Sequence, residues 1–250
     1  GKIMDRLTKI LDLVNKYKKI EVSKLSDALG VSQVTIRKDL DVLVKKGLIS
    51  REHGYATLNE SDDINNRLSI NYDIKKKIAR SALDIISNGE TVMIESGSTC
   101  AMFAEELAKN KKNITIITNS AFIASYIRKY PDCRTILLGG EYQKGSQVNV
   151  GPITKKCALE FFVDKLFIGI DGISMNADFT SSDLMRAETV KAMTTSANHV
   201  IVLTDSSKFM QRGLVNLLSF DEVDYLFTDT DIPDDIKYTL ENHKIKLNTI

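Results

Sequence analysis

Residues 22–58 constrain this chain more than any other segment, because two short helical patterns, a tight turn and two strand-like arms follow one another there. The first helical pattern, residues 22–29, ends at Gly30, and glycine adopts a positive φ without steric cost. Ser32 then stands where a hydroxyl can cap a second helix, which ends at Gly47. The apolar side chains at helical spacing in this second helix are Ile36, Leu40, Leu43 and Val44.

Residues 48–58 predict a small hairpin directly after the second helix. Two strand-like arms flank Gly54, which is the usual pattern of a tight turn between short strands. A hairpin in this place is the wing of a winged helix-turn-helix domain. The segment therefore predicts a protein that binds double-stranded DNA.

The face of the second helix that would meet DNA follows from a rotation of about 100° per residue. With Ile36 and Leu40 turned inward, Val34 and Lys38 point outward and Arg37 lies at the edge. An exposed Val34 suits a thymine methyl group in the major groove. The residues predicted to contact DNA are Ser32, Gln33, Val34, Thr35, Arg37, Lys38, Arg51 and His53. The alternative is a look-alike domain that binds no DNA, in which the lysines only form a solvated face.

The run 31–40, Val-Ser-Gln-Val-Thr-Ile-Arg-Lys-Asp-Leu, and the run 51–56, Arg-Glu-His-Gly-Tyr-Ala, resemble the amino-terminal domain of the DeoR family of bacterial transcription regulators. That family usually has two arginines before the Asp and two glycines in the wing, where this chain has Lys38 and Tyr55. Lys38 keeps the charge but lacks the bidentate fork of arginine. It is therefore predicted to contact a phosphate rather than to read a guanine.

The distribution of charge separates the two ends of the chain. Residues 1–60 contain 12 Lys and Arg against 8 Asp and Glu, whereas the remaining 190 residues contain 22 against 25. Only the amino-terminal part is therefore suited to a polyanion. Because the excess is modest, a monomer should bind DNA weakly, and we expect a homo-oligomer, a dimer or a tetramer, on the operator.

Length and composition fit two domains, since 250 residues with 43% hydrophobic and 27% charged side chains can bury one small and one larger core. We expect a winged helix-turn-helix domain over residues 1–58, a linker and helix lead-in over 59–73, and an effector-sensing and oligomerisation domain over 74–250. No run of about 18 apolar residues is present, so the protein is expected to be soluble and cytoplasmic, with no membrane partner.

The three cysteines, Cys100, Cys133 and Cys157, are odd in number and far apart. They fit neither a disulfide framework nor a Cys-x-x-Cys metal site, so we expect structural thiols, no metal and no cofactor. One alternative is a redox switch at Cys100, because that thiol follows the run 96–99, which is a candidate phosphate site.

Residues 59–66 are polar, as in a linker, and a single helix is predicted from about residue 69 to residue 87. Its buried stripe would be Ile74, Ile78, Ala82, Ile85 and Ile86. The basic cluster Lys75-Lys76-Lys77 with Arg80 predicts a solvated helix face, and contact with the DNA backbone is the alternative.

From residue 90 onward short apolar runs alternate with helical stretches, which is typical of βα units on a largely parallel sheet. The predicted strands are residues 91–95, 114–118, 134–138, 165–170, 200–204 and 225–228, with a weaker one at 245–247. Small, polar and charged residues follow these strands. Ligands of open α/β sheets bind outside the carboxyl ends of the strands, so the sequence predicts one cleft there.

Residues 96–99, Ser-Gly-Ser-Thr, precede a helix, and the free amides of such a helix start suit a phosphate. Lys208 at another strand end adds a cation, and Asp171 adds an acceptor for hydroxyl groups. Together these residues predict a ligand with an anionic head and a polyol body, such as a phosphorylated sugar. The alternatives are an ordinary capped helix start and a surface Lys208 paired with Asp205.

The same strand ends resemble the effector domain of the DeoR family in the runs 95–99, 118–120, 138–140, 167–172, 188–191 and 205–209. The resemblance implies an α/β domain related in fold to ribose-5-phosphate isomerases, a phosphorylated sugar as effector, and repression of carbohydrate-metabolism genes that the effector relieves. The effector-binding residues predicted from both arguments are Ser96, Gly97, Ser98, Thr99, Asn119, Gly139, Gly140, Asp171, Gly172, Glu188, Lys191 and Lys208.

One position departs from the family pattern, because Asp178-Phe179-Thr180 stands where the family usually has Gly-Leu-Thr. Aspartate is less suited than glycine to a positive φ, and it adds negative charge. If this loop borders the ligand, the substitution alters the choice of effector or impairs the site.

The alternative function from another class is an enzyme. An isomerase-like fold with Asp171 and Lys208 would be able to transfer a proton on a sugar phosphate, with Glu188 as a further carboxylate. No second carboxylate lies next to Asp171 in the sequence, and a fused DNA-binding module makes sensing the simpler function. We therefore predict a regulator and no enzyme.

Overall fold

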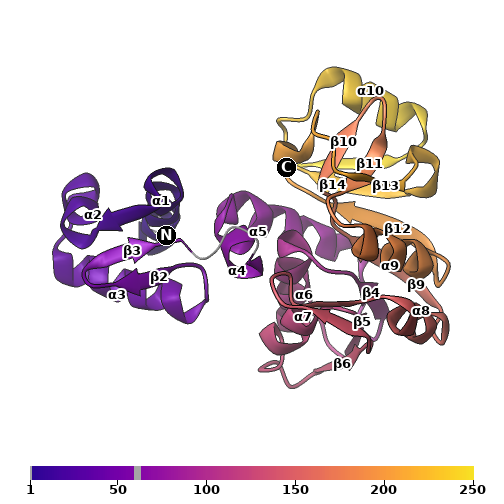
Figure 1. Ribbon diagram of the computed structural model, residues 1–250, viewed down its shortest axis with the longest axis horizontal. Coiled ribbons are helices and arrows are strands. Elements are labelled where there is room, and N and C mark those ends of the chain that lie inside the picture. Colours follow the sequence, from indigo (N-terminus) through magenta and orange to yellow (C-terminus); the bar gives the residue numbers. More distant parts are fainter. Residues whose placement is uncertain (1, 59–62) are drawn as a thin grey trace. The chain divides into compact units, whose positions relative to one another are not determined.

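The computed structural model describes residues 2–58 and 63–250, and the chain divides into two compact units, Gly1–Asp73 and Ile74–Ile250 (Figure 1). Of the predicted linker, residues 59–62 lie outside the described residues. Residues that follow them form a short helix, α4 (Ile64–Ser69), which Asp63 caps by accepting a 2.8 Å hydrogen bond from the Asn65 amide. The segment expected to lead into the following helix thus forms a separate helix, α4, before α5.

The first unit contains the predicted helix-turn-helix. Its elements are α1 (Lys2–Tyr17), β1 (Lys19–Glu21), α2 (Val22–Leu29), α3 (Gln33–Lys45), β2 (Ser50–Glu52) and β3 (Tyr55–Thr57). Gly30 ends α2 with a φ of 65°, and the Ser32 hydroxyl accepts a 3.2 Å hydrogen bond from the Thr35 amide at the start of α3. Both local signals are confirmed. Val44 was assigned wrongly to the buried face, because it lies at the rim of the helix and is 39% exposed.

The predicted hairpin is the β2–β3 pair, and β1 joins it to give a three-stranded sheet in the order β1-β3-β2. Glu52 pairs with Tyr55, so the turn contains only His53 and Gly54, whose φ angles are 41° and 85°. Two successive positive φ angles match the twist of adjacent strands, which is why a glycine is needed here. The strand β1 was not predicted, since no glycine turn pairs it with a neighbour in the sequence as Gly54 does for β2 and β3.

Helix α1 supplies much of the core of this unit, although the sequence analysis assigned it no role. Its buried side chains are Leu7, Ile10, Leu11 and Val14. Arg6 also reaches from α1 to α3, where it forms an ion pair with the buried Asp39, with 3.0 Å between Nη2 and Oδ1. The pair links the two helices, because each side chain satisfies the other's charge.

The single helix predicted over residues 69–87 is wrong. Asn71 has a φ of 54°, so the chain leaves the helical conformation after α4 and resumes it in α5 (Tyr72–Ser81) and the 3-10 turn η1 (Ala82–Ile85). The buried members of the predicted stripe are Ile78, Ala82 and Ile86. Ile74 is 36% exposed, and Lys75 is buried rather than part of a solvated face.

All seven predicted strands are present in the second unit, and they form one parallel sheet. Their bounds are β4 (Thr91–Ile94), β5 (Ile114–Thr118), β6 (Cys133–Leu137), β9 (Val163–Ile168), β12 (Ala197–Leu203), β14 (Tyr225–Thr228) and β15 (Lys246–Thr249). The order is β15-β14-β12-β9-β4-β5-β6. The chain first forms β5 and β6 on one side of β4, and then forms β9, β12, β14 and β15 on the other side. The connections therefore run in opposite directions away from the boundary between β4 and β9.

Two smaller antiparallel sheets follow strand ends of the main sheet and were not predicted. One contains β10 (Gly172–Ser174), β11 (Asp178–Ser181) and β13 (Val215–Leu218), and the other is the pair β7 (Glu141–Gln143) and β8 (Val148–Val150). These strands are three or four residues long, too short to carry a clear alternation of apolar and polar residues. The fold class is nevertheless as predicted, a small winged helix-turn-helix followed by an α/β domain with a mostly parallel sheet.

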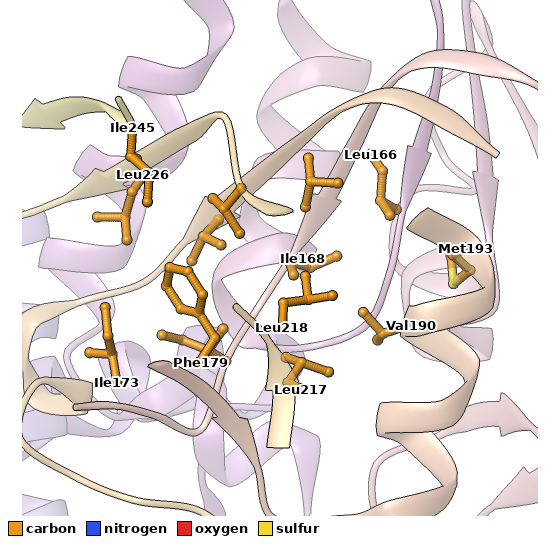
Figure 2. Packing of buried hydrophobic residues seen from close by; sticks show 14 of the residues in the cluster. Leu166, Ile168, Ile173, Phe179, Val190, Met193, Leu217, Leu218, Leu226 and Ile245 are labelled. Atoms are coloured by element: carbon orange, nitrogen blue, oxygen red, sulfur yellow. The ribbon is translucent and has the colours of Figure 1, made fainter. Parts of the chain in front are cut away.

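Helices cover both faces of the main sheet, and β9 shows why. Its alternate residues point to opposite faces. On one face, Phe167 packs against Phe103 of α6 (Ser98–Asn110), with ring centroids 4.2 Å apart. On the other face, Leu166 and Ile168 pack in one cluster with Val190 and Met193 of α9 (Leu184–Thr194). The same cluster includes side chains of the β10–β11–β13 sheet (Figure 2). The remaining helices are α7 (Ala121–Tyr126), α8 (Pro152–Leu159) and α10 (Asp234–Asn242).

None of the helices in the described part of the chain is long and apolar enough to cross a membrane.

Candidate functional sites

The predicted DNA-binding face of α3 is exposed and carries both apolar and cationic side chains. Val34 is 60% exposed, and Gln33, Arg37 and Lys38 are exposed beside it. Arg37 Nη2 donates a 3.2 Å hydrogen bond to Gln33 Oε1, which holds the two long side chains together on the first turns of the helix. An exposed valine at this position can make an apolar contact with a thymine methyl group in the major groove.

The wing is tied to α3 by an ion pair between Arg51 Nη1 and Asp41 Oδ1, which are 2.7 Å apart. This pair neutralises the one carboxylate that the predicted face of α3 presents. His53 lies in the wing turn and is exposed. Arg51 therefore contacts the helix that carries the other predicted DNA contacts, and His53 lies in the same unit.

A groove of about 440 Å³ lies between α1 and the turn of the helix-turn-helix, and the sequence analysis did not identify it. Its lining includes Lys2, Arg6 and Lys9, the carboxylate Asp5, which forms a 2.9 Å ion pair with Lys9, and the apolar Leu29 and Val31. Cations therefore lie beside the turn that leads to Ser32. The available signal was the spacing of three and four residues between these cations, which places them on one face of a helix.

The second candidate site lies where β4 and β9 adjoin, at the topological switch point of the sheet. After β4, Gly97 has a φ of 114° and no side chain caps α6, which begins at Ser98. Among the described residues, no N-cap side chain therefore satisfies the first-turn amides, including those of Ser98 and Thr99. Ser96 and Thr99 are both buried, and the Ser96 hydroxyl donates a 2.6 Å hydrogen bond to Glu95 Oε1.

Asp171 follows β9 at the same edge of the sheet. Its Oδ2 accepts hydrogen bonds from the amide and the hydroxyl of Ser182, at 2.7 and 2.9 Å. Burial opposes ionisation of this carboxyl, but the charge of Arg186, the two bonds from Ser182 and the charge of Lys208 outweigh it, so the pKa of Asp171 lies below its ordinary value. Asp171 is thus a charged acceptor at neutral pH.

Lys208 lies in the 3-10 turn η2 (Ser206–Lys208), after β12, close enough for its charge to act on Asp171. Within residues 2–58 and 63–250, no carboxylate is within 4.0 Å of its ammonium group. The alternative of a Lys208–Asp205 pair is therefore wrong. Asp205 instead accepts a 2.9 Å hydrogen bond from the Ser207 amide.

Arg186 was not among the site residues predicted from the sequence. It extends from the first turn of α9 to the β4–α6 turn, where Nη2 donates a 3.0 Å hydrogen bond to the Ser96 hydroxyl. Its Nε lies 4.0 Å from Glu95 Oε1, and its side chain is 12% exposed. Its place in the first turn of α9 was a signal in the sequence. The positive end of the helix dipole disfavours an arginine there, so a compensating interaction is expected.

Asn119 and Gly139 follow β5 and β6 on the other side of β4. Asn119 is fully buried, and its Nδ2 donates a 3.0 Å hydrogen bond to the Asn149 carbonyl. Gly139 accepts a 2.6 Å hydrogen bond from the Thr154 hydroxyl at its carbonyl. These contacts hold the ends of β5 and β6 against the segment 148–154.

Gly140 and Gly172 have packing reasons of their own. Gly140 has a φ of 143°, and an added Cβ would lie 1.9 Å from Thr154 Oγ1. A Cβ on Gly172 would lie 2.5 Å from the Gln211 carbonyl oxygen. Both distances are far inside van der Waals contact, so close backbone packing accounts for these two glycines without a ligand.

Glu188 and Lys191 make their ion pairs away from Ser96, Asp171 and Lys208. Glu188 forms ion pairs with Lys155 of α8, at 3.4 Å, and with Lys191, at 3.9 Å, and the side chains of Glu188 and Lys191 are each nearly half exposed. In α9 both positions are turned away from Arg186, because the rotation is about 100° per residue. None of these contacts involves Ser96, Asp171 or Lys208.

Asp178 is the first residue of β11, directly after the turn from β10, and has a φ of 56°, so the position does require a left-handed conformation. Its Oδ2 accepts a 3.0 Å hydrogen bond from the Phe220 amide. The carboxylate that replaces the family's glycine thus makes a contact within the domain, and it is not among the groups that surround Asp171.

Two alternatives from the sequence lose support in this geometry. Cys100 is fully buried, and burial together with the charge of Glu95 raises the pKa of its thiol well above the ordinary value, which disfavours the reactive thiolate. Asp171, with its lowered pKa and three hydrogen bonds to one oxygen, is a weak general base, and Glu188 forms its ion pairs with Lys155 and Lys191 instead.

Two family models match the chain. Residues 6–62 match a DeoR-like helix-turn-helix domain, and residues 70–230 match the DeoR C terminal sensor domain. The glycerol-3-phosphate regulon repressor of Escherichia coli (strain K12) is 32% identical over 242 residues, which cover 95% of each chain. The L-fucose operon activator of Haemophilus influenzae is 29% identical over 240 residues, covering 94% of this chain and 96% of that one.

Among solved structures, a ribose 5-phosphate isomerase A from Methanocaldococcus jannaschii aligns with 56% of this chain and 55% of its own, with a TM-score of 0.42 and 22% identity. Both domains, in their order and over nearly the whole chain, match one family. The chain therefore belongs to the DeoR family of DNA-binding transcription regulators.

Proposed function

We propose that this regulator is a repressor of carbohydrate-metabolism genes, and that a phosphorylated sugar bound at the carboxyl ends of β4, β9 and β12 changes its affinity for the operator. The observation that carries the proposal is that three features follow strands at one edge of the sheet: the uncapped start of α6, the charged Asp171, and Lys208, which forms no ion pair among the described residues. Relatives named as regulators of glycerol-3-phosphate and fucose genes support a sugar-derived ligand.

The proposal includes a homo-oligomer on double-stranded DNA. Symmetric regulators read paired half-sites, and the modest positive charge of residues 1–60 favours the use of two or more copies. It includes no catalytic step. An isomerase assay with pentose phosphates is the direct check on the enzyme alternative, because a regulator without a catalytic step should show no turnover.

Replacing Arg37 with Ala is expected to weaken operator binding by about 1–3 kcal/mol, or roughly 5- to 150-fold, if its guanidinium contacts a base. The loss should be largest at one base pair of each half-site. Lys38→Ala should instead weaken binding to all sequences about equally, since a phosphate contact carries no sequence information. Fluorescence anisotropy with operator and scrambled duplexes at physiological salt measures both.

The matched control is Arg212→Ala, which removes an exposed arginine from the second unit and should leave DNA affinity unchanged. Parent-like binding by both Arg37→Ala and Lys38→Ala would exclude the proposed face of α3.

Lys208→Ala is expected to raise the effector concentration for half-maximal response by about ten- to a hundredfold, because one charge-assisted contact in a partly buried site is worth roughly 1.5–3 kcal/mol. Operator affinity without ligand should stay the same. A thermal-shift screen of phosphorylated sugars, glycerol 3-phosphate included, identifies the ligand, and titration of operator release compares the variants.

Lys237→Ala, which removes an exposed lysine from α10, is the control for charge alone. Equal midpoints for the parent and Lys208→Ala would remove Lys208 from the site.

A further inference from the structure

We propose that Arg186 is a specificity-determining residue of the effector site, binding the anionic group of the ligand together with the first-turn amides of α6. This inference rests on the proposed effector site at the ends of β4 and β9. It adds a residue that lies between the two parts of that site. Arg186 contacts the β4–α6 turn through Ser96, and its charge also acts on Asp171 after β9.

The hydrogen bonds of Arg186 leave most of its donors for a ligand. A guanidinium has five N–H donors in a planar fork. Within the described residues its side chain donates one hydrogen bond, from Nη2 to the Ser96 hydroxyl, and its buried Nε has no hydrogen-bond partner. A buried charged donor without an acceptor costs free energy, so the arrangement favours an acceptor that arrives with the ligand.

The chemistry of the fork selects the kind of ligand group. Arginine binds carboxylate and phosphate oxygens in a bidentate manner, which a lysine cannot do. The first-turn amides of α6 converge on the same turn, since Gly97 leaves that helix uncapped by any side chain. Lys208, the second cation near Asp171, makes no ion pair in the described chain. A phosphate monoester suits two cations and a helix start better than a neutral sugar does.

A second buried atom at the same edge of the sheet supports a ligand with hydroxyl groups. Asn119 follows β5, the neighbour of β4, and its Oδ1 is buried without a hydrogen-bond partner among the described residues. An amide oxygen of this kind accepts a hydrogen bond from a hydroxyl. Arg186 would therefore hold the anionic end, and Asn119 and the charged Asp171 would accept from the polyol.

The competing explanation is that Arg186 only neutralises Glu95. That carboxylate is 1% exposed, and Nε of Arg186 lies 4.0 Å from Glu95 Oε1. The distance is at the limit of an ion pair, and the Ser96 hydroxyl stands between the two groups by donating to Glu95 and accepting from Arg186. The two explanations differ in what happens when the charge of Glu95 is also removed.

The test uses the full chain, with inorganic phosphate and chloride at matched ionic strength as probes and the melting temperature of the second unit as readout. Four proteins form a cycle: the parent, Arg186→Met, Glu95→Gln and the double variant. Methionine keeps the length of the stem and removes every donor. We expect the parent and Glu95→Gln to be stabilised by phosphate, and both variants without Arg186 to need at least about ten times more phosphate for the same shift.

A double variant that regains stability and responds to phosphate as Glu95→Gln does would overturn the inference, because Arg186 would then only balance Glu95. A single Arg186→Met variant that fails to fold does not interfere, since the double variant removes the buried charge of Glu95 together with that of Arg186. A parent that responds to neither phosphate nor any phosphorylated sugar would instead remove the proposed effector site itself.

Discussion

Phe167→Ala is expected to lower the free energy of unfolding of the second unit by about 3–5 kcal/mol. Phe167 is fully buried in the central strand β9 and packs on Phe103 of α6, so its removal leaves a cavity between sheet and helix that the neighbouring strands cannot close. The same strand continues into Asp171, and the loss therefore also loosens the edge that carries the effector site. Urea denaturation followed by circular dichroism measures the change.

Phe162→Ala is the matched control, because this phenylalanine lies just before β9 and is 68% exposed. It should change the free energy of unfolding by no more than about 0.5 kcal/mol. Equal destabilisation by the two substitutions would contradict the packing described for the face of β9 toward α6.

Leu40→Ala is expected to abolish operator binding by unfolding the first unit rather than by removing a contact with DNA. Leu40 is fully buried on the inner face of α3, and its truncation should cost about 2–5 kcal/mol. A domain of this size has a total stability of the same order, so most molecules would lack a folded recognition helix. Amide hydrogen exchange should show loss of protection over α1 to α3.

The second unit should keep its melting transition and its response to phosphate in this variant, since Leu40 belongs to the other compact unit. Val44→Ala, on the exposed rim of α3, is the control and should leave protection unchanged. The comparison also separates folding from recognition, because Arg37→Ala should lose affinity while protection stays as in the parent. Tight operator binding by Leu40→Ala would show that α3 is not anchored through this side chain.

Local signals in the sequence predicted the recognition helix and its wing, because caps, turns and periodicity depend on neighbours in the chain. Ser32 caps α3 through Thr35, three residues away, and Gly54 completes a two-residue turn. The same reasoning failed where one residue interrupts a periodic pattern. Asn71 breaks the predicted helix over residues 69–87, and nothing in the spacing of the isoleucines reports its positive φ.

The sequence by itself determined the winged helix-turn-helix, the seven parallel strands and the edge of the sheet at which polar residues collect. Each of these follows from patterns within a few residues. Only the tertiary structure decided which side chains meet at that edge, bringing Arg186 to Ser96 across 90 residues of chain, leaving Lys208 without a partner in the described part, and turning Glu188 toward Lys155. Which distant side chains meet depends on the order of the strands in the sheet and on which face of α9 is turned toward the sheet. Neither is encoded by a pattern of neighbouring residues.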